Sequence, residues 1–242
     1  MVSRDGVFGI LIGAAVGTLF LVPAHGSAQW ELFHGDPCSS AVIYMSRLGG
    51  LISCAETGYA PDQYTLGVMY DNGMRVAEDD AEAVRWYRRA AEQGHASAQN
   101  NLGVMYDNGN GVPDDDAEAV RWYRLSVEQG FAAAQYNLGL MYEHGNGVPE
   151  DDAEAVRWYR LAADQGDALA QTNLGFMYAH GDGVPPDLVF AYMWFNLSAA
   201  QGNETAQSNE QIIEQYLTRE QFAEAQRLSR EWIAEHPQDG GN

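Results

Sequence analysis

Apolar and small side chains recur through most of the chain with the three- and four-residue spacing of amphipathic helices. One such stripe consists of Ala98, Leu102, Met105 and Tyr106. The next consists of Ala119, Trp122, Tyr123 and Ser126. Polar and glycine-rich residues separate the two stripes. The pattern therefore predicts two helices joined by a turn within residues 96–130.

This helix pair recurs with a period of 36 residues. The recurring positions are Leu66-Gly67, Leu102-Gly103, Leu138-Gly139 and Leu174-Gly175; Tyr70, Tyr106, Tyr142 and Tyr178; and Trp86, Trp122, Trp158 and Trp194. A fixed period of this length indicates a solenoid, in which each unit buries its apolar face only against its neighbours.

Three glycines of the second unit have predicted structural roles. Gly103 has no side chain beside Leu102, so the second helix of the unit can approach the first closely. Gly109 and Gly130 follow the two helices, where a residue with positive φ commonly ends a helix. Together they predict where each helix ends and where the two helices touch.

An acidic cluster lies between the two stripes and is the first candidate for a metal site. Asp107, Asn108, Asn110 and residues 114–116 carry oxygen ligands, but their spacing does not match the EF-hand loop. Acidic residues at 114–116 and Glu118 are instead typical of a helix start, where the helix dipole favours negative charge. Arg121 follows Glu118 by three residues and can pair with it.

Two histidines occupy equivalent positions of successive units, His144 and His180. Stacked helices lie about 10 Å apart, too far for two such side chains to share one zinc ion. We therefore predict no metal and no cofactor.

The recurring motif LGxMYxxGxGVPxDDAEAVRWYR, followed by AxxQG, resembles Sel1-like repeats, which are relatives of tetratricopeptide repeats. The resemblance covers residues 60–202 as four units. It implies an all-α, right-handed solenoid of antiparallel helix pairs. It also implies a role in holding other proteins together, commonly in bacterial envelopes and signalling pathways.

The segments on either side of the repeats are predicted to cap the solenoid. Residues 29–59 contain a stretch, 41–58, that aligns with a second helix alone. Residues 203–236 predict two further helices, 205–216 and 218–235, the latter opened by a capping box formed by Thr218 and Gln221. Residues 237–242 form a predicted flexible tail.

The first 28 residues have the pattern of a secretory signal peptide. Arg4 precedes an apolar stretch at residues 7–22, and small residues follow at Gly26-Ser27-Ala28. The stretch of 16 residues is shorter than the roughly 20 needed to span a bilayer, and an uncleaved anchor is the alternative. If the signal is cleaved, the protein is predicted to be periplasmic or secreted. It is predicted to contact the membrane only if the signal is retained.

The two cysteines, Cys38 and Cys54, would both lie in an oxidising compartment after export. A disulfide between them is a candidate. One straight helix would hold the sulfurs roughly 24 Å apart, beyond bonding distance, whereas a break at Gly49-Gly50 would allow a hairpin.

Charge and composition exclude several classes of function. The chain carries 13 basic and 34 acidic residues, a net charge of -21, which repels phosphate backbones and excludes nucleic acid as a favoured ligand. All the basic residues are arginine, so lysine-dependent catalysis is absent. Gly-x-Ser-x-Gly, HExxH and CxxC are absent too, and we predict no catalytic residues and no enzyme activity.

The resemblance places the first helix of each unit on the concave face of the solenoid. The residues expected on that face are Tyr64, Asn100, Tyr136 and Thr172; Val68, Val104, Leu140 and Phe176; and Asp71, Asp107 and Glu143. This set offers polar, aliphatic and acidic rows. It predicts a groove that binds a partner protein through a basic extended or helical segment.

The predicted function is thus a non-enzymatic scaffold of a bacterial cell envelope. The alternative is a regulator that binds peptidoglycan or a cell-wall enzyme, with tyrosines stacking on sugars.

Overall fold

The computed structural model describes residues 9–11, 20–22 and 48–236, in two units, residues 1–41 and 42–242. In the first unit, β1 (Gly9–Leu11) and β2 (Phe20–Val22) pair antiparallel, with Ile10 opposite Leu21. The sequence pattern did not predict these strands. The rest of the predicted signal peptide lies outside the described residues, as do Cys38 and the predicted tail. In the described part of the chain, no helix has the length and apolar character needed to cross a bilayer.

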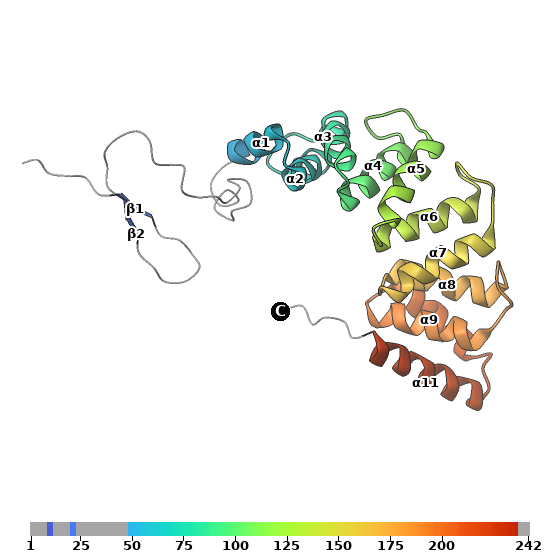
Figure 1. Cartoon of the computed structure of the whole chain (residues 1–242). Coiled ribbons are helices and arrows are strands. Elements are labelled where there is room, and N and C mark those ends of the chain that lie inside the picture. Colours follow the sequence, from blue (N-terminus) through green and yellow to red (C-terminus); the bar gives the residue numbers. More distant parts are fainter. Residues whose placement is uncertain (1–8, 12–19, 23–47, 237–242) are drawn as a thin grey trace, which may run out of the picture. The chain divides into compact units, whose positions relative to one another are not determined.

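The second unit is an array in which each helix packs on the one before it, except that the last helix packs on the helix two before it (Figure 1). Those described are α1 (Leu48–Thr57), α2 (Ala60–Asp71), α3 (Asp80–Glu92), α4 (Ala96–Asn108), α5 (Asp116–Val127), α6 (Ala132–His144), α7 (Asp152–Asp164), α8 (Ala168–His180), α9 (Leu188–Ala200), α10 (Glu204–Glu214) and α11 (Arg219–Glu235). The tightest pairs are α2–α3, α4–α5, α6–α7 and α8–α9, one pair in each 36-residue unit. The predicted all-α array of helix pairs is confirmed.

The ends of the helices follow from local sequence. Asp115 is the N-cap of α5, and its Oδ1 accepts a hydrogen bond from the backbone N–H of Glu118 at 3.0 Å. Asp79, Asp151 and Asp187 cap α3, α7 and α9 in the same way. Gly109 ends α4 with φ of 67°, as predicted. Asp115 and Asp116 of the acidic cluster therefore serve the start of α5, and Arg121 pairs with Glu118 as expected.

The two helices of each repeat touch where a buried ring lies against a glycine. Tyr123 of α5 is fully buried, and a Cβ at Gly103 of α4 would lie 2.6 Å from its ring. Tyr87 on Gly67, Tyr159 on Gly139 and Phe195 on Gly175 repeat this contact. The predicted role of Gly103 is confirmed, and the facing ring is the group that requires it.

Successive repeats are joined by a ladder of glutamines. Gln129 at the end of α5 donates from Nε2 to Oε1 of Gln99 on α4, at 2.7 Å. The buried Gln99 in turn donates to the carbonyl oxygen of Ala91 in the preceding repeat, at 3.1 Å. The pairs Gln93–Gln63, Gln165–Gln135 and Gln201–Gln171 have the same geometry. Each buried glutamine therefore joins the two helices of its own repeat. Gln99 also binds the backbone of the preceding repeat.

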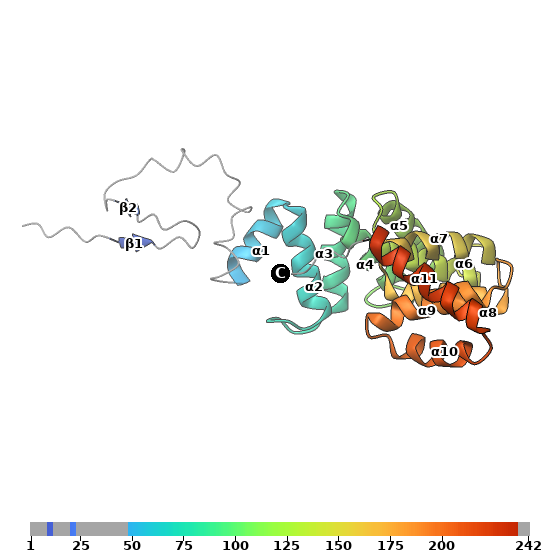
Figure 2. The ribbon, with the colours of Figure 1, turned by 90° about the horizontal axis from the view of Figure 1, so that it is seen from below.

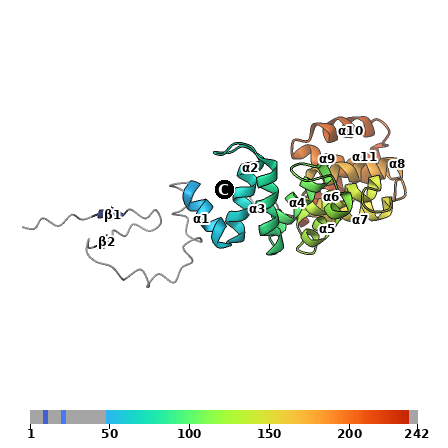
Figure 3. The same ribbon diagram turned by 90° about the horizontal axis from the view of Figure 1, so that it is seen from above.

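Helices α10 and α11 cover the C-terminal end of the repeats. Figures 2 and 3 show α10 at the margin of the unit, beside α9. The predicted capping box of α11 is present: the hydroxyl of Thr218 accepts from the N–H of Gln221, and Oε1 of Gln221 accepts from the N–H of Thr218. Trp232 of α11 packs edge-on against Trp194 of α9, with ring centroids 6.2 Å apart.

Candidate functional site

A row of acidic side chains at the C-terminal ends of α2, α4 and α6 is the most regular polar feature of the first helices. The hydroxyl of Tyr87 donates to Oδ2 of Asp71 at 2.8 Å. The hydroxyl of Tyr123 donates to Oδ2 of Asp107 at 3.4 Å. Tyr159 and Glu143 form the third such pair. In each of these three repeats the second helix therefore fixes the orientation of the acid on the first helix.

The fourth repeat has no such pair, because Ala179 replaces the acid and Phe195 replaces the tyrosine. The acidic row therefore ends at Glu143.

Burial governs the proton affinity of these groups. Burial raises the pKa of the Tyr87, Tyr123 and Tyr159 hydroxyls, so they remain protonated donors. Burial also raises the pKa of Asp107, and repulsion by Asp116 adds to this effect, while the hydrogen bond from Tyr123 opposes it. Asp107 is thus a carboxylate in an already acidic neighbourhood, a position that favours an added cation.

An apolar row lies one helical turn before the acids. Val68, Val104, Leu140 and Phe176 are all half-buried. Phe176 packs edge-on against Phe195 at 5.1 Å between ring centroids. Each repeat therefore presents a partly exposed aliphatic or aromatic side chain at this position.

Two tyrosines extend the site at the N-terminal halves of their helices. Tyr64 stacks on His95, with ring centroids 4.7 Å apart, and is half-buried. Tyr136 is tilted against Tyr159 at 5.8 Å and is also half-buried. Both rings keep part of their surface accessible.

The structure places Asn100 and Thr172 differently from the other predicted site residues. Both are buried, with 7% and 5% of their surface exposed. Oδ1 of Asn100 accepts from Nδ2 of Asn137 at 2.9 Å, and Thr172 shares a 2.8 Å hydrogen bond with Ser198. These two side chains therefore stabilise the array and are not free to contact a partner. The other nine predicted residues are half-buried.

Sequence reasoning missed the residues that support the row. The hydroxyls of Tyr87, Tyr123 and Tyr159 were not predicted to bind the acids, and the half-buried Asn101, Asn137 and Asn173 were not singled out. Asn101 hydrogen-bonds the Tyr87 hydroxyl, which lowers the pKa of Tyr87 against the larger effect of burial. The recurring Asn-Leu-Gly tripeptide was the available signal.

The site offers binding groups and a curved surface. In Figure 1, α2 and α4 lie on the inner side of the bend in the array, with α3 and α5 outside them. Among the described residues, no group of three or more His, Cys, Asp or Glu side chains could hold a metal ion. The available chemistry is hydrogen bonding to carboxylates, apolar contact and ring stacking.

Comparison with known proteins agrees with this architecture. The Sel1 repeat matches at residues 60–95, 96–131, 132–167 and 168–203. The chain matches no curated protein. Among solved structures it is similar to c5321, a protective antigen of uropathogenic Escherichia coli with an SLR fold, at 38% identity and a TM-score of 0.74, over 78% of this chain and 40% of the antigen. The chain thus spans less than half of that protein.

A Sel1 repeat protein from Oxalobacter formigenes is similar at 37% identity and a TM-score of 0.65. That match covers 78% of this chain and 76% of the other. The four repeat matches and this likeness show that the chain belongs to the Sel1 repeat family.

Proposed function

We propose that this protein is a non-enzymatic scaffold of a bacterial cell envelope that binds a segment of a partner protein along one face of α2, α4, α6 and α8. We call this face the groove surface. It consists of Tyr64, Val68, Asp71, Val104, Asp107, Tyr136, Leu140, Glu143 and Phe176. The sequence pattern of residues 1–28 supports the location in the envelope.

The observation that carries this proposal is the set of three acids held by tyrosine hydroxyls. Each hydrogen bond engages one carboxylate oxygen, and a carboxylate has a second oxygen that can accept from a ligand. Side chains whose orientation is already fixed lose little entropy on binding. The site is therefore preorganised for cationic groups.

The chemistry of the groove surface favours a basic partner segment. Its three carboxylates belong to a chain of net charge -21, which accelerates association with cations and excludes acidic competitors. The adjacent apolar row would cover the aliphatic parts of lysine or arginine side chains. An extended strand or a helix with basic and apolar residues on one side fits both rows.

The test is capture of partners from the native periplasm, identified by mass spectrometry. A variant with Tyr136→Ala, Leu140→Ala and Glu143→Gln should lose the captured protein and keep its helical circular dichroism. A matched variant changes the exposed residues Leu161→Ala, Leu169→Ala and Glu150→Gln and should capture it normally. Unchanged capture by the first variant would contradict the groove surface.

The same variants test the cell-wall alternative. Purified peptidoglycan should not retain the wild-type protein. Retention that the triple variant loses would overturn the proposal of a protein partner in favour of glycan binding.

A further inference from the structure

Three of the four repeats place an arginine of their own over the recurring tryptophan. The guanidinium carbon of Arg121 lies 4.4 Å from the centre of the Trp122 ring, and that of Arg157 lies 4.5 Å from Trp158. In the first repeat, Arg85 and Arg89 lie over Trp86, at 5.2 and 4.7 Å. Each of these repeats thus contains a cation–π contact on the second helix.

A glutamate three residues earlier pairs with Arg85, Arg121 and Arg157. Glu118 accepts from both Nε and Nη2 of Arg121, at 2.8 and 2.5 Å. Glu82 pairs with Arg85 at 3.0 Å, and Glu154 pairs with Arg157 at 3.1 Å. The recurring unit is therefore a carboxylate, a guanidinium and an indole ring.

The fourth repeat keeps the tryptophan and loses both charged residues. Phe190 stands where the glutamate recurs, and Met193 stands where the arginine recurs. Trp194 is 4% exposed, and no arginine of the described residues lies over its ring. The fourth repeat therefore has the indole ring without the guanidinium and the carboxylate.

A cavity of about 300 Å³ opens beside this tryptophan, between α7, α9 and α11. Its apolar wall consists of Tyr178, Phe190, Met193, Trp194, Leu228 and Trp232. The indole N–H groups of Trp194 and Trp232 are buried and find no acceptor in the described part of the chain. The wall of the cavity is therefore mainly aromatic, and the two indole N–H groups lie beneath its surface.

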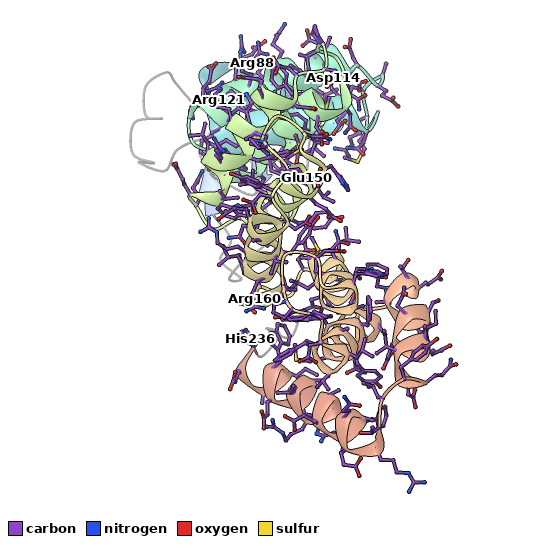
Figure 4. The ribbon with its side chains drawn as sticks, turned by 90° about the vertical axis from the view of Figure 1, so that its right-hand side faces the viewer. Arg88, Asp114, Arg121, Glu150, Arg160 and His236 are labelled. Carbon is purple, nitrogen blue, oxygen red and sulfur yellow. The ribbon has the colours of Figure 1, made fainter. Side chains whose placement is uncertain are left out.

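The charged residues of the cavity favour a cation. Asp164, Glu231 and Glu235 line it together with a single cation, Arg160. Arg160 is committed to the hydroxyl of Tyr178, and Glu231 pairs with Arg227 at 2.5 Å. Figure 4 labels Arg160 on α7 and His236 at the end of α11, and the ring of His236 stacks on Trp232 with ring centroids 4.4 Å apart. Asp164 and Glu235 remain as the carboxylates able to receive a new cation.

We propose that this cavity binds an arginine side chain of another protein. The guanidinium would enter the cavity beside Trp194, at the position where the chain's own arginines lie beside Trp86, Trp122 and Trp158 in the other repeats. Asp164 and Glu235 would replace the missing glutamate. Arginine fits better than lysine because its planar group stacks on a ring while donating to a carboxylate at its edge.

This site is separate from the groove surface, since the two share no residue. A protein that failed to bind any partner in the groove could still bind arginine here. The two proposals can therefore fail independently.

Isothermal titration with a synthetic peptide, acetyl-Gly-Gly-Arg-Gly-Gly-amide, tests the proposal on the full chain. The peptide should saturate one site, and the citrulline peptide, which has the same shape without the charge, should bind about tenfold more weakly or not at all. The lysine peptide should fall between them. Equal binding of the arginine and citrulline peptides, or no saturable binding, would overturn the proposal.

Two charge-matched variants locate the binding. Asp164→Asn with Glu235→Gln should weaken binding of the arginine peptide by about tenfold, because both carboxylates that face the cation are gone. Glu128→Gln with Asp182→Asn makes the same change in charge elsewhere, at the position equivalent to Asp164 in the second repeat and in an exposed turn. Equal weakening by this control would show a general effect of charge and overturn the site.

The triple variant of the groove surface should bind the arginine peptide normally. Loss of binding in that variant would place the arginine in the groove and contradict the cavity.

Discussion

A half-buried carboxylate illustrates how binding groups affect stability at the scale of one residue. Asp107 is partly desolvated and lies near Asp116 and Asp114, and its pKa is raised. Because the pKa of Asp107 is higher in the folded state than in the unfolded state, the folded state favours the protonated carboxyl. Stability from this group is fully present below the unfolded pKa and is lost as the pH rises through the folded pKa. At neutral pH the fold therefore carries a cost that a bound cation would relieve.

Asp107→Asn tests this cost directly. The amide keeps an acceptor for Tyr123 and removes the charge, so the melting temperature should rise at pH 7 and be unchanged at pH 3, where Asp107 is protonated in both states. Differential scanning fluorimetry at the two pH values measures it. Asp182→Asn, at an exposed turn, is the control. A lower melting temperature for Asp107→Asn at pH 7 would mean that the carboxylate stabilises the fold.

The limit of sequence reasoning is clearest at Asn100 and Asn101. They are neighbours of one residue type, yet Asn100 is buried and Asn101 is half-buried. Asn100 bonds Asn137, 37 positions away, and Asn101 contacts Tyr87 of the preceding repeat. Such burial depends on neighbouring repeats, so the sequence could not show that Asn100 and Thr172 are buried while the other nine residues expected on this face are half-buried.

Elements, in contrast, follow almost entirely from local sequence. Helix ends were predicted from glycines, acidic caps and the Thr218–Gln221 box because each acts within three or four residues. The close contact between paired helices also requires a glycine opposite a buried ring. Gly103 is that glycine in the second repeat, and it lies against the ring of Tyr123. The closeness of α4 and α5 is therefore set by a single missing side chain.

Gly103→Ala should lower the free energy of unfolding by about 1 to 3 kcal/mol, because the added methyl would lie 2.6 Å from the Tyr123 ring and force the helices apart. Alanine is otherwise the better helix former, so the sign of the change separates packing from propensity. Urea denaturation followed by circular dichroism measures it. Gly49→Ala in α1, where an added Cβ would meet no other part of the described chain within 4 Å, should be neutral or stabilising. A stabilised Gly103→Ala variant would show that the ring moves freely.

At the scale of the whole array, each repeat contacts its neighbours through the same groups. Buried glutamines at 63, 99 and 171 donate to a backbone carbonyl of the helix before their own, and glycines of the turns at 111, 147 and 183 approach the backbone at the start of the second helix of the preceding repeat. A Cβ at Gly111 would lie 2.4 Å from the carbonyl of Asp80, and one at Gly147 would lie 2.4 Å from that of Asp116. Interfaces built from identical parts should be interchangeable.

Deletion of residues 96–131 tests this interchangeability. The deletion removes one period of the Sel1 repeat and joins His95 to Ala132, so α6 should pack on α3 as α4 does now. Because stability in a solenoid is approximately a sum over repeats and their interfaces, the shortened chain should melt cooperatively at a lower temperature with the same helicity per residue. Deletion of residues 96–113, half a period, should abolish the cooperative melt because it leaves one helix without its partner. Circular dichroism compares the two. A shortened array that loses cooperativity would show that the second repeat makes contacts its neighbours cannot replace.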